Sequence, residues 1–375
     1  MPEDIRTGLA LSGGGYRAML YNLGSLWRLN ELGWLRKMDM ITSVSGGSIL
    51  NGVLGTQWKR LAWRQQGDGW VADNFPDVVG KPVQDMAGTP IDVAANIEGI
   101  LSIFSTISDK VTASYDKHLF HGAKMQGAIP EFEKGKTPRF LFYATSLQTG
   151  ASVRIERKRL ADYNVGEIPN PDLPVARVVA ASSAFPPILS PVELKINPGS
   201  WKPFDKGGPL FDRPEFKEKL LLTDGGVYDN MGLEAIWDRC ETVLVSDAGA
   251  PLDMNPQPPT DWTRQAVRVL DIVTEQTRAL RKRRLIADFK QSVRKGTYWG
   301  ITTKIGDYGL QDAFARDTDT TASLSQIRTR LDEFSAEEQG RLINWGYALA
   351  DAAMRKHVVF GGSRPVAWPV AQFPL

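Results

Sequence analysis

Two glycine-rich turns, about thirty residues apart, constrain the fold of this chain more than any other feature. The first is Ser12 to Gly15 and the second is Ser43 to Gly47. Each follows a short apolar run and precedes a segment with apolar residues at helical spacing. A strand, a tight turn and a helix, repeated in succession, predict a parallel α/β sheet flanked by helices.

The remaining segments extend this pattern. We expect loop over 67–90, a helical insertion or lid over 91–120, a hairpin of 139–146 and 151–157, a helix over 174–183, strands at 219–223 and 242–246 with a helix between them at 231–239, and helices over 262–293 and 321–357. The last of these is interrupted at Ser335, where Ser335 and Glu338 form a capping box. No linker divides the chain, so we expect one domain over 1–375, with its core at about 7–250 and a helical elaboration at about 260–375.

Composition excludes several classes of protein. The formal net charge of +2 favours no nucleic-acid partner, and the single cysteine, Cys240, allows no intramolecular disulfide. We find neither a signal-peptide pattern nor an apolar run long enough to span a bilayer. These features predict a soluble, cytoplasmic protein whose membrane contact is peripheral.

The serine-centred turn suits a nucleophile. Small neighbours permit the sharp strand-to-helix turn that exposes Ser45, and the following helix dipole favours developing negative charge. Ser43 and Ser48 compete for this role, but only Ser45 is central in a small-x-Ser-x-Gly frame. A plain structural turn and a phosphate-binding turn remain alternatives.

The glycine run is compatible with three kinds of loop. A phosphate-binding P-loop would end in Gly-Lys-Ser/Thr, whereas this run continues as Tyr16-Arg17-Ala18. The spacing of Gly13, Gly15 and Ala18 fits a dinucleotide loop, but no acidic residue ends the second strand. An oxyanion hole formed by the backbone amides of Gly13, Gly14 and Gly15 is the remaining interpretation.

The general base is harder to find, because the chain has only three histidines, His118, His121 and His357, and none lies at an expected strand end. Asp224 ends an apolar strand and begins an Asp-Gly-Gly turn. A carboxylate with an ordinary pKa is a weak base, so its surroundings must desolvate or orient it.

The glycine run, the serine turn and the Asp-Gly-Gly turn, in this order, resemble the patatin-like phospholipase family and its cytosolic phospholipase A2 relatives. The segment 181–187 and Asp229-Asn230 match further, so the resemblance covers about 7–250. It implies a three-layer α/β fold in which Ser45 is the nucleophile and Asp224 its base. Gly13, Gly14 and Gly15 would hold the oxyanion, without a histidine, a metal or a cofactor. Two residues depart from the pattern: Ser43 replaces the first glycine of the elbow, and Ala18 replaces a glycine that often closes the oxyanion motif.

The implied function is lipid acyl hydrolysis of the phospholipase A or lysophospholipase type, through an acyl-serine, on a phospholipid or other lipid ester. Arg17, just after the glycines, either faces substrate phosphate or braces the loop. A soluble carboxylesterase or thioesterase is the alternative on the same site. A regulated membrane-degrading effector, activated by a partner or small molecule, is a third possibility. The oligomeric state stays open.

Two segments combine features of a membrane interface with a simpler explanation. Trp58, Trp63 and Trp70 lie among basic residues, but indoles at helix ends often pack inward. The basic cluster 278–284 can attract anionic lipid or form a solvated helix face.

Overall fold

The fold is organised around a central β-sheet. The computed structural model describes residues 6–89, 91, 104–249, 251–360 and 362–375. Within these ranges the sheet has ten strands: β1 (Thr7–Leu11), β2 (Met40–Ser43), β5 (Arg139–Ser146), β6 (Ser152–Glu156), β7 (Arg159–Asp162), β8 (Gly166–Pro169), β9 (Val192–Lys195), β10 (Lys219–Asp224), β11 (Thr242–Asp247) and β12 (Lys295–Gly300). A separate hairpin pairs β3 (Trp63–Gln66) with β4 (Gly69–Ala72).

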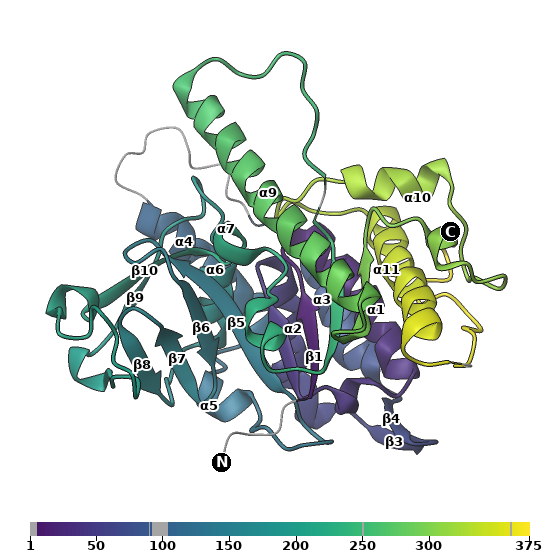
Figure 1. Cartoon of the computed structure of the whole chain (residues 1–375), viewed down its shortest axis with the longest axis horizontal. Helices are drawn as coiled ribbons and strands as arrows, with labels where there is room; N and C mark the ends of the chain where they lie inside the picture. Colours follow the sequence, from purple (N-terminus) through teal and green to yellow (C-terminus); the bar gives the residue numbers. More distant parts are fainter. Residues whose placement is uncertain (1–5, 90, 92–103, 250, 361) are drawn as a thin grey trace.

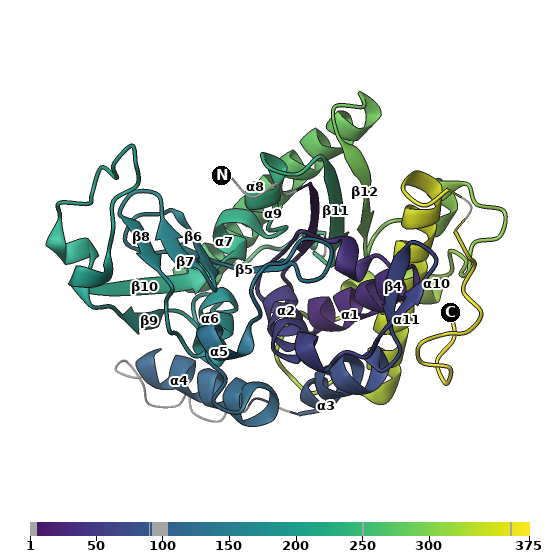
Figure 2. The ribbon, with the colours of Figure 1, turned by 90° about the horizontal axis from the view of Figure 1, so that it is seen from below.

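The helices flank this sheet. They are α1 (Gly15–Glu31), α2 (Gly46–Gln57), α3 (Lys81–Ala87), α4 (Phe104–Tyr115), α5 (Met125–Ala128), α6 (Val175–Ser182), α7 (Gly226–Asp229), α8 (Glu234–Trp237), α9 (Trp262–Lys290), α10 (Asp319–Ser323) and α11 (Ala336–His357). Seen from below, the antiparallel strands β6 to β8 lie at one end of the molecule and α1 and α11 toward the other (Figure 2).

The parallel part of the sheet brings the two sequence turns together. Its strands lie in the order β12, β11, β1, β2 and β5, all parallel. The register pairs Leu11 at the end of β1 with Ser43 at the end of β2. The turns that follow these strands therefore emerge side by side at the carboxyl edge of the sheet, where α/β folds place their ligand sites.

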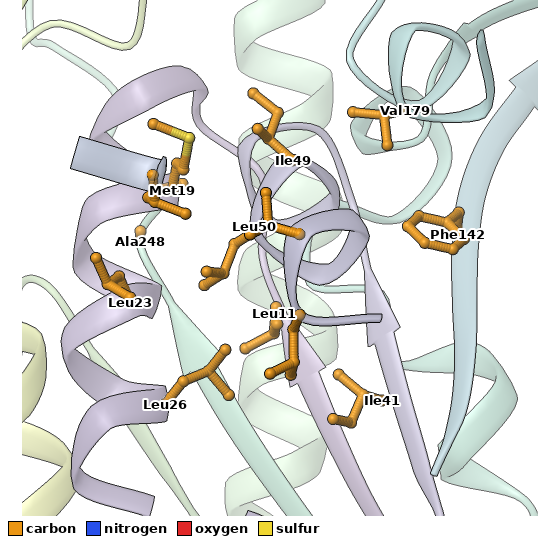
Figure 3. Packing of buried hydrophobic residues seen from close by; sticks show 14 of the residues in the cluster. Leu11, Met19, Leu23, Leu26, Ile41, Ile49, Leu50, Phe142, Val179 and Ala248 are labelled. Atoms are coloured by element: carbon orange, nitrogen blue, oxygen red, sulfur yellow. The ribbon is translucent and has the colours of Figure 1, made fainter. Parts of the chain in front are cut away.

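Side chains that alternate along the strands supply two separate cores, one on each face. On one face, side chains such as Leu11, Ile41 and Phe142 pack against α1, α2 and α6 (Figure 3). On the other face, Ala10 and Tyr143 belong to the core that includes α8 and Leu285 of α9. Both faces are covered, which gives three layers.

Helices α1 and α11 pack closely against each other beside this sheet (Figure 1). A buried ion pair joins them, with Arg28 and Asp351 at 2.8 Å. Asp351 also pairs with Arg355 of α11 at 2.9 Å. The elaboration after residue 260 thus packs against the first helix of the core.

These observations confirm the predicted fold class. The hairpin, the helices over 174–183 and 262–293 and the strands at 219–223 and 242–246 all form, as α6, α9 and the corresponding strands. The capping box of Ser335 and Glu338 begins α11 as expected. The assignment of the whole chain to one domain stays a prediction.

Three expectations were wrong in detail. The segment 67–90 is not all loop, because it contains β4 and α3. The helix expected over 231–239 is reduced to the single turn of α8. The first part of the 321–357 helix is only α10 and a 3-10 turn, so α11 stands alone. Residues 92–103 of the expected insertion at 91–120 lie outside the described residues, and the part from 104 to 120 forms α4 and the turn at 116–120.

Candidate active site

A cavity of about 620 Å³ lies at the carboxyl edge of the sheet. Its lining includes the glycine turn Gly13–Gly15 after β1, Ser45 after β2 and Asp224 at the end of β10. All five residues that the sequence singled out for an oxyanion hole and a dyad therefore meet in one place. A volume of this size is typical of sites for small organic ligands.

Ser45 occupies a strained turn between β2 and α2. Its φ of 52° and ψ of −121° are unusual for a residue with a side chain. The turn is held from behind, because the Ser45 amide donates to the carbonyl of Ser182 at 3.2 Å and to its hydroxyl at 3.1 Å. This geometry is that of a nucleophile elbow, in which the hydroxyl stands at the start of a helix.

The two competing serines have other partners. Ser43 Oγ donates to the Leu141 carbonyl at 3.2 Å and accepts from Ser48 Oγ at 2.9 Å. Ser48 Oγ also lies 2.8 Å from Ser182 Oγ, and both Ser43 and Ser48 are fully buried. Ser43 and Ser48 thus brace the elbow from inside, and Ser45 alone of the three lines the cavity.

The glycine turn and the elbow touch each other through backbone atoms. A Cβ on Gly13 would lie 2.9 Å from Cβ of Ser45, and a Cβ on Gly46 would lie 1.9 Å from the Gly15 carbonyl oxygen. Both positions therefore need glycine for close approach. The contact places the amides of the glycine turn next to Ser45, where an oxyanion would form.

The three predicted amide donors are not equivalent. The Gly13 amide donates to the backbone carbonyl of Asn230 at 3.0 Å, so its hydrogen is already engaged. Gly14, with a φ of 136°, and Gly15, the first residue of α1, are then the stronger candidates for donors to an oxyanion. Engagement of Gly13 ties the glycine turn to the segment that follows Asp224.

Asp224 is buried at the end of β10. Its Oδ1 accepts from the Gly226 amide at 2.7 Å, while its own amide donates to the Ala184 carbonyl at 2.9 Å. Burial raises the pKa of Asp224 to about 7, and the hydrogen bonds from Gly226 and the Ser45 hydroxyl only partly oppose that shift. A carboxylate with such a pKa is a useful base near neutral pH.

The second carboxylate oxygen of Asp224, Oδ2, is the one that is available to accept a proton. Asp224 Oδ2 is buried and has no partner with full hydrogen-bond geometry among the described residues. The Ser45 hydroxyl nevertheless lies close enough to lower the Asp224 pKa. The pair is therefore near, but not aligned, as is common for catalytic pairs in the absence of substrate.

Arg17 braces the loop. Its guanidinium donates to the carbonyls of Ser325 at 3.2 Å, Ile327 at 2.7 Å and Ala248 at 2.9 Å. Burial lowers its pKa to about 10. Arg17 lines the cavity, but three carbonyl partners favour the bracing role over contact with substrate phosphate.

The histidines take no part in this site. His118, His121 and His357 are all exposed, and none of them lines the cavity. The ring of His357 packs edge-on against Tyr308 at the end of α11.

Much of the cavity wall is formed by residues outside the glycine, serine and aspartate turns. The segment 185–189 supplies an apolar wall, and the segment 329–332 supplies another side. Helix α9 contributes charged residues, among them Asp271, Glu275 and Arg278. The family resemblance included the first of these segments, but no local signal marked the other two.

Each of the two segments considered as membrane surfaces contains a buried side chain. Trp58 is buried against Trp63 and Phe140, with ring centroids 5.0 and 5.6 Å apart. Arg278 is also buried, 2.7 Å from Asp247, so it belongs neither to a solvated face nor to a lipid-facing one. No helix in the described ranges combines the length and the apolar character needed to cross a bilayer.

Comparisons with known proteins agree with the fold. The sequence model described as Patatin-like phospholipase matches residues 9–237, more than half of the chain. Human GIVD cytosolic phospholipase A2 has a similar fold, with a TM-score of 0.52 and 12% identity over 94% of this chain and 59% of that one. The same human enzyme in complex with methyl gamma-linolenyl fluorophosphonate gives a TM-score of 0.51 and 14% identity, over 94% and 58%. The chain thus spans less than three fifths of the length of these structures. A search of curated protein sequences found no match.

Proposed function

Because this chain belongs to the patatin-like phospholipase family, we propose that it is a lipid acyl hydrolase that cleaves carboxylic esters through Ser45 and Asp224. Family membership supports lipid hydrolysis in general. The dyad rests on one observation above all: Ser45, in a strained elbow, shares a cavity with a buried aspartate whose pKa is raised to about 7.

The proposed reaction has two acyl-transfer steps. Asp224 accepts the proton of Ser45 as the hydroxyl oxygen attacks the ester carbonyl, and the amides of Gly14 and Gly15 stabilise the oxyanion. Collapse of this intermediate breaks the ester bond, and the proton on Asp224 passes to the departing alcohol. Water then attacks the acyl-serine, giving its proton to Asp224, and that proton returns to Ser45 as the fatty acid leaves. Each amide donor is expected to contribute about 3 kcal/mol of transition-state stabilisation.

The walls of the cavity support an amphiphilic substrate. The apolar segment 185–189 faces the site from one side and suits an acyl chain. Charged groups of α9, among them Arg268 and Asp271, line another side and suit a polar head group. We therefore place phospholipids or lysophospholipids ahead of soluble short-chain esters.

The test measures fatty acid release from phospholipid vesicles and from a soluble short-chain ester. Ser45→Ala and Asp224→Asn are each expected to lose at least about 10³-fold in kcat. Matched controls are Ser323→Ala and Asp238→Asn, which change the same groups at exposed sites away from the cavity and are expected to retain wild-type rates. Full activity in Ser45→Ala would refute the mechanism.

Other outcomes select among functions. Hydrolysis of the soluble ester alone would assign the chain as a carboxylesterase. Activity that appears only after a cell extract is added would assign it as a regulated effector.

A covalent probe tests the nucleophile without turnover. A fluorophosphonate, the class of inhibitor bound in the human phospholipase structure, is expected to add to the wild-type protein once, at Ser45. Intact-mass analysis and peptide mapping would detect the adduct. An adduct of the same stoichiometry in Ser45→Ala would contradict the assignment.

A further inference from the structure

Helix α9 has the reverse of the usual surface-helix pattern. Its exposed large apolar side chains form a row on one face: Trp262, Val269, Ile272, Val273 and Leu280. A surface helix normally buries its apolar stripe and exposes charge. In α9 only Arg278 and Leu285 are buried, and all five side chains of the row are exposed.

The charged face of the same helix points the opposite way. Asp271, Glu275 and Arg278 line the cavity, at helical spacing. With 100° of rotation per residue, Asp271 and Arg278 lie about 180° around the axis from Trp262 and Val273. The helix thus presents charge to the cavity and an apolar row away from it.

The start of α9 projects from the rest of the molecule together with the loop before it (Figure 1). Met254 in that loop is 94% exposed, and Trp262, the first residue of the helix, is 82% exposed. The second half is anchored, because Leu285 is buried and Arg281 donates to the Tyr228 carbonyl at 2.9 Å. The projecting apolar row is therefore held on a fixed base.

All exposed charges on α9 have the same sign. The exposed charged side chains of the helix are Arg264, Arg283, Arg284 and Lys290. Its acidic residues are only partly exposed: Glu275 pairs with Arg278 at 2.8 Å, and Asp288 lies 3.5 Å from Arg294. The outer face of α9 is consequently apolar and basic, a combination that suits an anionic lipid surface.

We propose that this outer face, defined as Met254, Trp262, Val269, Val273 and Leu280 with the exposed Arg283 and Arg284, docks on an anionic lipid bilayer. The inference rests on the proposed function, since the substrate then lies in the surface that α9 binds. The opposite face of the same helix lines the catalytic cavity, so docking would bring the lipid next to the site. This surface overlaps the basic cluster 278–284 at Leu280, Arg283 and Arg284, and it adds the apolar side chains before that cluster.

A second copy of the chain fits this face less well. Two such helices packed together would bring Arg283 and Arg284 of one copy near those of the other, and like charges oppose association. A single helical row is also small beside the roughly 800 Å² per partner of a stable interface. Anionic lipid satisfies both the apolar row and the charges.

Binding is measured apart from hydrolysis, in the Ser45→Ala background. The protein is sedimented with phosphatidylcholine vesicles that contain or lack phosphatidylglycerol. We expect binding that increases with phosphatidylglycerol and falls as salt is raised. Val269→Asp together with Val273→Asp is expected to weaken binding at least about tenfold.

The matched control is Val366→Asp, which places the same charge at a valine that is 98% exposed in the C-terminal segment. It is expected to bind vesicles as the parent does. With Ser45 intact, the variant Val269→Asp/Val273→Asp is expected to hydrolyse a soluble ester within about twofold of wild type, because Val269 and Val273 do not line the cavity. That rate also reports that the variant folds.

Several results would overturn the docking proposal. These are absence of vesicle binding, equal binding by the double variant, or equal loss in Val366→Asp. A wild-type dimer that the double variant dissociates in sedimentation velocity would assign the face to a second copy. Vesicle binding without any ester hydrolysis would leave docking supported and refute the proposed function instead.

Discussion

The ionisation of Asp224 predicts the pH dependence of catalysis. Burial raises the pKa of this carboxyl from 3.8 to about 7, and in the proposed mechanism only its charged form accepts the proton of Ser45. The charged fraction is about one eleventh at one pH unit below the pKa and about ten elevenths at one unit above it. We therefore expect kcat/KM to increase about tenfold from about pH 6 to about pH 8, with an apparent pKa near 7.

The assay uses initial rates on a soluble ester whose alcohol does not ionise in this range, at constant ionic strength. A soluble substrate separates ionisation in the site from any effect of pH on vesicles. If Asp224 had its ordinary pKa, kcat/KM would be flat over the same interval and would fall only near pH 4. A flat profile would refute the reasoning.

Histidine is the residue type that most often titrates near neutral pH, so it needs a control. The variant in which His118, His121 and His357 are all alanine leaves the cavity untouched, since all three side chains are exposed and outside its lining. We expect this variant to keep the inflection. Loss of the inflection there would assign it to a histidine and remove the role given to Asp224.

Two further predictions concern stability. The folded-state pKa of Asp224 lies above its unfolded value, so the folded state binds the proton more tightly and loses stability as pH rises between these two pKa values. Relative to Asp224→Asn, the wild-type free energy of unfolding is expected to fall by about 3 kcal/mol between about pH 5 and about pH 8. Urea unfolding at each pH measures it. A constant difference would contradict the buried, raised-pKa carboxyl. Replacing Arg28 with alanine leaves the fully buried Asp351 with Arg355 as its remaining arginine partner and is expected to destabilise by about 2–3 kcal/mol. The exposed pair of Lys81 and Asp85 is its control: Lys81→Ala should change stability by less than about 1 kcal/mol, and similar losses in both variants would contradict the role of burial.

The parts of the site found from sequence are those whose chemistry demands particular residue types. Gly46 cannot carry a side chain, because the Gly15 carbonyl oxygen would lie 1.9 Å from its Cβ, and Ser45 needs such neighbours for its strained turn. These demands leave a pattern in the sequence. The parallel strands β1 and β2 then bring the turns together through register alone.

The parts that sequence missed depend on what a segment faces. The charges of α9 at 271, 275 and 278 have the spacing of a solvated helix face, and nothing local indicates that they line a cavity. Strand β12 was not predicted, because Lys295–Gly300 is short and contains two glycines. The segment 67–90 has Gly67, Gly69 and Pro76, which favour turns, yet tertiary packing forms β4 and α3 within it.

Because no histidine lines the cavity, the proposed base is Asp224, and its pKa depends on the charges around it. A guanidinium beside Asp224 would favour its charged form and lower its pKa, which would make it a poorer base. Four arginines line this cavity, and two of them are held by other groups: Arg278 pairs with Asp247 at 2.7 Å and with Glu275, and Arg17 donates to three backbone carbonyls. Burial is then the dominant influence on Asp224, opposed only by hydrogen bonds. In the proposed mechanism, the ion pairs and carbonyls that hold Arg17 and Arg278 therefore do more than stabilise the fold, because they keep these two guanidinium groups from pairing with the carboxylate that would act as the base in place of a histidine.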